Sequence, residues 1–99
     1  MKMLIIEDDK LLAESIGDYL SDNFSVDLAG NGEEGLYEAE KDIYDCILLD
    51  IMMPEMNGYE VLENLRKQGI TTPGIMITPK DGLEDKVKGL KLCADDYIV

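Results

Sequence analysis

Residues 46–54 read CILLDIMMP. The first four are apolar, and a run of this length is typical of a strand that is buried on both faces of a sheet. Asp50 ends the run, and a turn that closes at Pro54 follows it. A carboxylate in this position lies at the C-terminal edge of a buried strand, where open α/β sheets collect ligands and chemistry. The stretch therefore predicts both a parallel sheet and a functional site at Asp50.

A second acidic group follows the first apolar run of the chain. Residues 3–6 read MLII, and Glu7, Asp8 and Asp9 come directly after them. If the two runs form neighbouring parallel strands, these carboxylates converge on Asp50. Such a cluster repels itself unless a cation binds or protons are taken up, and Mg²⁺ prefers hard oxygen ligands of this kind. We therefore expect a Mg²⁺ site in which Asp50 is also a potential nucleophile.

Apolar runs and helical periodicities alternate along the whole chain. Strands are predicted at residues 3–6, 24–28, 46–49, 75–77 and 97–99, and helices between them around residues 12–20, 33–43, 59–65 and 83–94. This alternation is typical of a parallel sheet with helices on both faces, and right-handed crossovers restrict its topology. We predict an α/β fold: a flavodoxin-like, doubly wound parallel sheet with strand order 2-1-3-4-5, five strands and four helices. That order places the ends of the first and third strands side by side.

Cap and stop signals delimit three of the predicted helices. Asp9 and Asn31 are expected to cap the first and second helices, because short polar side chains accept hydrogen bonds from the free N–H groups of a first turn. Gly69 is expected to end the third helix. The inner face of the second helix is expected to hold Leu36, Ala39 and Ile43.

Length and charge exclude several functions. The 99 residues fit one domain, and a hydrophobic content of 45% is enough for a core. Nine basic and 22 acidic residues give a net charge of −13, which argues against direct binding of nucleic acid or of an anionic membrane. No apolar run has the length of a signal sequence or a membrane span. Cys46 and Cys93 lack metal-ligand spacing and a histidine partner, so we expect reduced cysteines in a cytoplasmic protein.

Taken together, these features resemble the receiver domain of bacterial two-component response regulators. The resemblance runs from residues 7–9 through LLDIMMP at 48–54 and Asn57-Gly58 to Ile77-Thr78 and ADDY at 94–97. It is closest to receivers that precede a winged-helix DNA-binding domain, and the 99 residues contain no such domain. The resemblance implies a receiver domain over residues 1–99 that acts in signal transduction and transcription regulation. It is not an enzyme in the ordinary sense, since it catalyses only its own phosphoryl transfer and acyl-phosphate hydrolysis.

The resemblance assigns roles to the acidic residues. It implies that Glu7, Asp8 and Asp50 hold Mg²⁺, with the backbone carbonyl of Met52 as a further ligand. Asp8 and Asp50 would coordinate directly and Glu7 through a water molecule. Asp50 is then the phosphoacceptor, which attacks a phosphohistidine of a sensor histidine kinase and forms an acyl phosphate. The metal neutralises charge on the transferring phosphoryl group.

Two further residues are implied to report the modification. Thr78 resembles the switch hydroxyl of the family, which bonds a phosphoryl oxygen once Asp50 is modified. Tyr97 resembles the partner aromatic residue, which turns inward as the threonine moves. A new dianionic group at Asp50 would in this way draw an output surface into a second state.

The sequence departs from the family pattern in three places. The family's phosphate-contacting lysine and a fifth helix would follow Val99, so we expect the domain to be incomplete at its C-terminal end. Pro79 has no N–H to offer the phosphoryl group, and Cys93 stands where the family has glycine. We also expect apolar residues of the first and fourth helices, such as Ile16, Leu20 and Leu90, to be exposed. Such a surface favours a homodimer or a domain-exchanged oligomer.

Other functions of the same fold are distinguished by single positions. A flavin carrier would need a hydroxyl- and glycine-rich phosphate loop after the first strand, where Glu7 to Asp9 would instead repel a phosphate. A phosphatase with an aspartyl-phosphate intermediate would have an acid two residues after its nucleophile, where this chain has Met52. One alternative stays open because of Pro79 and the absent lysine. It is a receiver-like interaction or dimerisation module with impaired phosphorylation.

Overall fold

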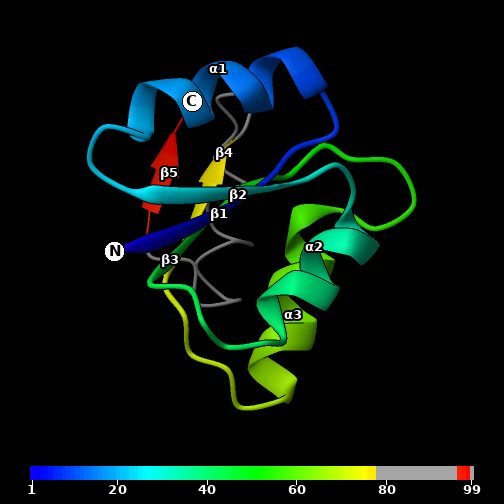
Figure 1. Cartoon of the computed structure of the whole chain (residues 1–99). Coiled ribbons are helices and arrows are strands. Elements are labelled where there is room, and N and C mark those ends of the chain that lie inside the picture. The colour runs from blue at the N-terminus through cyan, green and yellow to red at the C-terminus, as the bar shows by residue number, and fades with distance from the viewer. Residues whose placement is uncertain (78–95, 99) are drawn as a thin grey trace.

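A computed structural model describes residues 1–77 and the backbone of residues 96–98. Its elements are β1 (Lys2–Ile6), α1 (Lys10–Leu20), β2 (Ser25–Ala29), α2 (Gly32–Ala39), β3 (Cys46–Asp50), α3 (Gly58–Lys67), β4 (Gly74–Ile77) and β5 (Asp96–Ile98). The strands form one parallel sheet in the order β2-β1-β3-β4-β5 (Figure 1). The predicted flavodoxin-like topology is therefore confirmed. The fourth predicted helix, around residues 83–94, lies outside the described residues.

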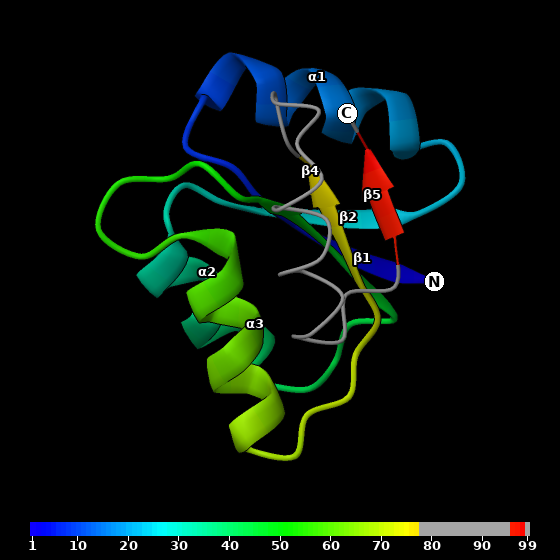
Figure 2. The same cartoon turned by 180° about the vertical axis from the view of Figure 1, so that it is seen from behind.

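The sheet is covered on both faces. α1 lies over one face, and α2 and α3 lie over the other, as the front and rear views agree (Figures 1 and 2). Successive side chains of a strand point to opposite faces, so each central strand contributes to two cores. The larger core packs strand residues Leu4, Ile6, Ile47, Leu49 and Met76 with residues of α2 and α3, and the smaller one joins Ile5 and Leu48 to Ala13 of α1. Burial on both faces explains why these strands are apolar throughout.

Polar side chains start each helix at the expected place. The Leu12 N–H donates to Asp9 Oδ1 at 3.1 Å, and the Glu34 N–H donates to Asn31 Oδ1 at 2.8 Å, so both predicted N-caps are confirmed. α3 begins with a reciprocal capping box between Asn57 and residue 60. The third helix ends before Gly69, whose φ of 79° suits glycine.

The predicted inner face of α2 is wrong at its last position. The helix ends at Ala39, and Ile43 is 51% exposed. Asp42 adopts a left-handed conformation with φ of 55°, which turns the chain so that helical spacing no longer applies. Tyr44 is buried instead, and its hydroxyl donates to Asp27 Oδ2 at 2.7 Å.

α1 packs against the sheet through its smallest residues. Ala13 and Gly17 are its buried positions, and a Cβ on Gly17 would meet Val26 and Leu28 of β2 at 3.6 and 3.5 Å. Ile16 and Leu20 are half-buried and pack against the smaller core as well, so the predicted exposure of these two residues is only partial. Tyr19 is 83% exposed.

Candidate functional site

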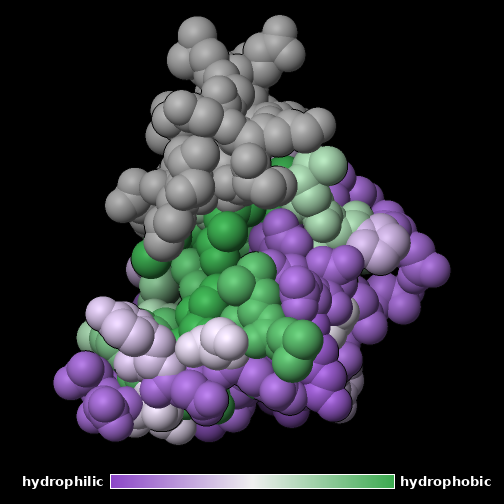
Figure 3. Space-filling view, turned by 90° about the horizontal axis from the view of Figure 1, so that it is seen from above, coloured by the Kyte–Doolittle hydropathy of each residue, from purple (hydrophilic) through white to green (hydrophobic). Residues whose placement is uncertain are grey.

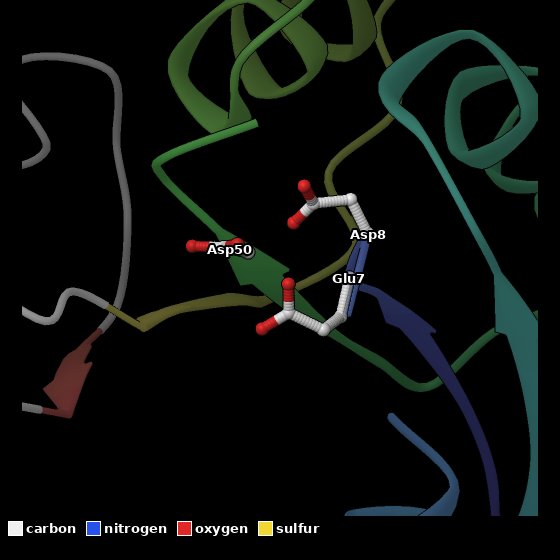
Figure 4. Close-up of side chains that lie close together, drawn as sticks. All are labelled: Glu7, Asp8 and Asp50. Atoms are coloured by element: carbon white, nitrogen blue, oxygen red, sulfur yellow. The ribbon is translucent and has the colours of Figure 1, made fainter. Parts of the chain in front are cut away.

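The register of the sheet brings the two acidic segments together. β1 pairs with β3 so that Ile6 lies beside Leu49. Glu7 comes directly after Ile6 and Asp50 directly after Leu49, so both acids lie at the same edge of the sheet. Carboxylate oxygens of Glu7, Asp8 and Asp50 all lie within 4.8 Å of one another. Figure 4 shows the three side chains gathered where β1 and β3 end. The convergence predicted from the sequence is confirmed.

Two of these carboxylates are buried. Glu7 is 4% exposed and Asp50 is 7% exposed, whereas Asp8 is open to solvent. Burial, with a further contribution from the carboxyls of Asp50 and Asp8, raises the pKa of Glu7 to about 8. Burial also raises the pKa of Asp50. Water solvates these anions poorly, so the cluster favours either bound protons or a bound cation.

Backbone N–H groups orient the two buried side chains. The Met52 N–H donates to Asp50 Oδ1 at 3.0 Å, and the Asp9 N–H donates to Glu7 Oε2 at 3.3 Å. A carboxylate accepts several hydrogen bonds or ligands, so Asp50 keeps capacity for a metal ion or a reacting group. The Met52 bond favours the ionised form of Asp50 and partly offsets the effect of burial on its pKa.

The donor set fits a divalent cation. Three carboxylates that converge from two neighbouring strand ends supply hard oxygen ligands on one side, as Mg²⁺ requires, and leave the rest of its shell to water or substrate. A cation there would also offset the cost of burying ionised carboxylates, which raises the pKa values of Glu7 and Asp50. The arrangement can therefore hold a metal ion. The backbone carbonyl of Met52 as a ligand stays a prediction.

The predicted switch residues fall outside this description. Thr78 and the side chain of Tyr97 do not belong to the described part of the chain, while the backbone of Tyr97 lies in β5 beside Met76. Their predicted roles are therefore not tested by the geometry.

The loop after β3 contains positions that sequence reasoning missed. A Cβ on Gly58 would lie 2.6 Å from the Asp50 carbonyl oxygen, so the first residue of α3 must be glycine for the loop to close against the end of β3. Glu55 has a φ of 67°, and the Met56 N–H donates to the Pro54 carbonyl at 2.8 Å. The sequence signal for this tight loop was the Asn57-Gly58 pair, which by itself indicates only a turn.

The sequence profile of the response regulator receiver domain matches residues 3–99. The chain belongs to this family. Among curated relatives of this receiver domain, the transcriptional regulatory protein CiaR of Streptococcus pneumoniae is 52% identical over 98 residues, which are 99% of this chain and 44% of that protein. The cell cycle response regulator CtrA of Brucella ovis is 46% identical over 99 residues, 99% of this chain and 43% of that protein. The chain thus spans less than half the length of these relatives.

Solved receiver structures have the same fold. The receiver domain of the Francisella response regulator 1452 has a TM-score of 0.92 at 39% identity, covering 98% of this chain and 81% of that one. The chemotaxis protein CheY4 of Vibrio cholerae has a TM-score of 0.92 at 31% identity, covering 99% of this chain and 84% of that one. The curated relatives show that this receiver domain is related to transcriptional response regulators. In the described part of the chain, every helix is too short or too polar to cross a membrane.

Proposed function

We propose that this receiver domain accepts a phosphoryl group on Asp50 from a sensor histidine kinase, in a Mg²⁺-dependent reaction in the cytoplasm, and thereby switches an output surface. The cluster of Glu7, Asp8 and Asp50 at the ends of β1 and β3 supports this proposal most directly. Regulation of transcription through an appended DNA-binding domain belongs to the proposal too, since the transcriptional relatives are more than twice as long as this chain.

The proposed reaction makes one bond and breaks one. An Asp50 carboxylate oxygen attacks the phosphorus of a phosphohistidine, the phosphorus–nitrogen bond breaks, and the imidazole leaves with the bonding electrons and takes up a proton. Water later attacks the same phosphorus, the bond between phosphorus and the Asp50 oxygen breaks, and inorganic phosphate leaves the regenerated carboxylate. Bound Mg²⁺ would supply charge neutralisation on the transferring group. Glu7, Asp8 and Asp50, with the Met52 carbonyl, would hold that ion, and the Met52 N–H orients the Asp50 side chain.

The proposed readout uses Thr78 and Tyr97. The threonine hydroxyl would donate to a phosphoryl oxygen on Asp50, and the aromatic ring would follow it inward. Asp50 pairs with Ile77, the last residue of β4, and Thr78 is the next residue in the sequence. This register supports the proposal for Thr78.

Phosphorylation is testable with a small phosphodonor. Incubation with acetyl phosphate and Mg²⁺ is expected to add the mass of one phosphoryl group to the intact protein, and omission of Mg²⁺ is expected to prevent the gain. The measurement is intact mass spectrometry over time. Binding of Mg²⁺ without any gain in mass would contradict the proposal and would instead support the interaction module with impaired phosphorylation.

We also propose that two copies associate through an apolar groove beside α1. The groove has a volume of about 380 Å³ and is lined by Met3, Ser15, Ile16, Tyr19, Leu20, Leu48 and Ile75. None of these described lining residues is charged, although the chain as a whole carries −13. Figure 3, which looks onto the side that carries α1, shows a hydrophobic area with hydrophilic residues along part of its border. Two copies can meet here without opposing charges among the described residues that line the groove.

The same face offers a projection and a recess. Tyr19 stands 83% exposed at the border of the groove, and we propose a two-fold arrangement in which each Tyr19 enters the groove of the other copy. Such self-complementarity is what a symmetric dimer interface requires. The aromatic side chain supplies a large apolar contact with a polar tip.

Replacing Tyr19 by glutamate is expected to give a monomer at concentrations where the wild type dimerises, because the charge would be buried in an apolar recess. Tyr37→Glu is the matched control, since Tyr37 is also a well exposed tyrosine, 65% accessible on α2 and outside the groove. Light scattering across a concentration series measures both. A wild type that stays monomeric at high concentration would contradict the dimer, and association that survives Tyr19→Glu would point to exchange of a segment between copies.

A further inference from the structure

The corner between β2 and α2, residues 29–32, contributes no carboxylate to the acidic cluster. It contacts the segment after β1 that carries Glu7 and Asp8, which is the β1 half of the cluster. The Glu7 N–H donates to the Ala29 carbonyl oxygen at 3.0 Å. Ala29 is buried, and Asn31 anchors the other end of the corner by accepting the Glu34 N–H at 2.8 Å. The corner therefore fixes the backbone from which the Glu7 carboxylate projects.

The same corner contacts the β3 half of the cluster. Gly32 is buried, and a Cβ built on it would lie 2.7 Å from Met56 Cβ and 3.0 Å from the Met56 carbonyl carbon, closer still to the carbonyl oxygen. Real Cβ atoms do not approach backbone atoms so closely, and a backbone group cannot rotate away as the end of a side chain can. Any side chain at position 32 must push the loop that contains Met56.

That loop carries the groups that hold the phosphoacceptor. It runs from Ile51 to Asn57, includes the Met52 N–H that orients Asp50, and is tightly folded at Glu55 and Met56. Its far end closes on the Asp50 carbonyl through Gly58. A displacement at Met56 is therefore transmitted along a short, stiff loop to Met52 and Asp50.

We infer that Gly32, in the β2–α2 corner, is a positioning residue for the metal centre, because it sets the separation between the β1 ligands and the loop after β3. The inference deepens the proposed function and rests on it, since it concerns the Mg²⁺ affinity of that site. Residues that orient metal ligands without touching the ion change affinity by roughly 10- to 100-fold when they are replaced. Gly32 acts in this way through a backbone contact.

Gly32→Ala is expected to weaken Mg²⁺ binding by about 10-fold. Isothermal titration calorimetry with Mg²⁺ alone gives the dissociation constant without relying on phosphorylation. The initial rate of labelling by acetyl phosphate is expected to fall at limiting Mg²⁺ and to recover at saturating Mg²⁺, because the nucleophile itself is intact. A loss that persists at saturating Mg²⁺, or an unchanged dissociation constant, would overturn the inference.

Two controls separate positioning from general damage. Gly30→Ala makes the same chemical change in the same corner, where a Cβ would meet only Glu34 Oε2 at 3.9 Å, and it is expected to leave Mg²⁺ affinity unchanged. Leu65→Ala opens a cavity in the core away from the site, and it is expected to lower stability but not Mg²⁺ affinity. A loss of affinity in either control as large as that in Gly32→Ala would overturn the inference.

The remaining outcomes are also decisive. If Gly32→Ala does not fold, Met56→Gly perturbs the loop side of the contact by removing the Met56 side chain and loosening the backbone beside Gly32, and an unchanged Mg²⁺ affinity in that variant would overturn the inference. A wild type that binds no Mg²⁺ would overturn the proposed function itself. A wild type that binds Mg²⁺, with Gly32→Ala indistinguishable from it, would overturn only the role of the corner.

Discussion

Asp50→Asn is expected to abolish the gain of a phosphoryl group from acetyl phosphate. The amide keeps the shape of the side chain and can still accept the Met52 N–H, so the loop after β3 should keep its position. What the substitution removes is the anionic oxygen that attacks phosphorus, and no other group can form the acyl phosphate at this position. Intact mass after incubation with Mg²⁺ measures the effect, which is complete loss rather than a reduced rate.

Asp9→Asn is the matched control for this experiment. It removes one negative charge from the same acidic stretch, but Asp9 is exposed and its side chain caps α1. Asparagine is an equally good N-cap, so phosphorylation and stability are expected to match those of the wild type. A phosphoryl gain retained in Asp50→Asn would show that another residue is modified. Peptide mapping would then locate it and refute Asp50 as the phosphoacceptor.

The sheet and the acidic cluster were predictable from sequence because their signals are local. The runs at 3–6 and 46–49 are apolar on both faces, which only a doubly covered parallel strand requires. Each run ends in an acid, and parallel strands end at one edge. The observed pairing of Ile6 with Leu49 therefore follows from two short patterns and one topological rule.

The packing of α1 was not predictable in the same way. Hydrophobic periodicity places Leu12, Ile16, Tyr19 and Leu20 at helical spacing, and these are the residues that a stripe of apolar side chains would bury. The fully buried positions are instead Ala13 and Gly17. Ile16 and Leu20 pack half-buried against the smaller core, and Tyr19 is exposed. Hydropathy ranks residues by transfer energy and does not register which positions of a helix lie nearest the sheet.

The contact between Gly32 and Met56 was hidden for a different reason. The sequence marks Asn31-Gly32 as a turn and a cap, and both assignments are correct. The steric demand on Gly32 comes from a loop that is distant in the chain, so no local pattern carries it. The burial of Tyr44 in place of Ile43 has a similar origin, since the positive φ of Asp42 breaks the helical count.

The metal-free domain is expected to lose stability as the pH rises from about 4.5 to about 8. The folded state holds a proton on Glu7 up to a pKa of about 8, whereas the unfolded chain releases it near the ordinary glutamate pKa of 4.5. Between these values the folded state binds more protons than the unfolded state, so the free energy of unfolding falls with pH and is level above the window. The raised pKa of Asp50 acts in the same direction. The loss is on the order of 2 to 4 kcal/mol.

Mg²⁺ is expected to reverse this loss. The ion binds ionised carboxylates and competes with protons for them, so its effect should be small at pH 5 and large at pH 8. A concentration 100 times the dissociation constant contributes about 2.7 kcal/mol. The hydrogen bond from the Tyr44 hydroxyl is the main cause of a lowered pKa at Asp27. This group has the opposite effect, because its contribution to stability is lost as the pH falls below the ordinary aspartate pKa of 3.8, outside this window. Urea unfolding at pH 5, 7 and 8, with and without Mg²⁺, measures both dependences.

Glu7→Gln identifies the group responsible. The amide cannot ionise, so the variant is expected to be more stable than the wild type at pH 8 without Mg²⁺ and to show a much flatter pH profile. Its gain from Mg²⁺ should shrink, because one carboxylate of the cluster is gone. Glu63→Gln, which removes an exposed carboxylate of α3 paired with Lys67 at 3.3 Å, should change stability by less than about 1 kcal/mol and leave the profile intact. A wild type whose stability is constant from pH 5 to 8 would contradict this prediction. It would mean that the buried carboxylates are already neutralised without protons or Mg²⁺. The acidic cluster would then not be a site that requires a metal ion to offset its negative charge.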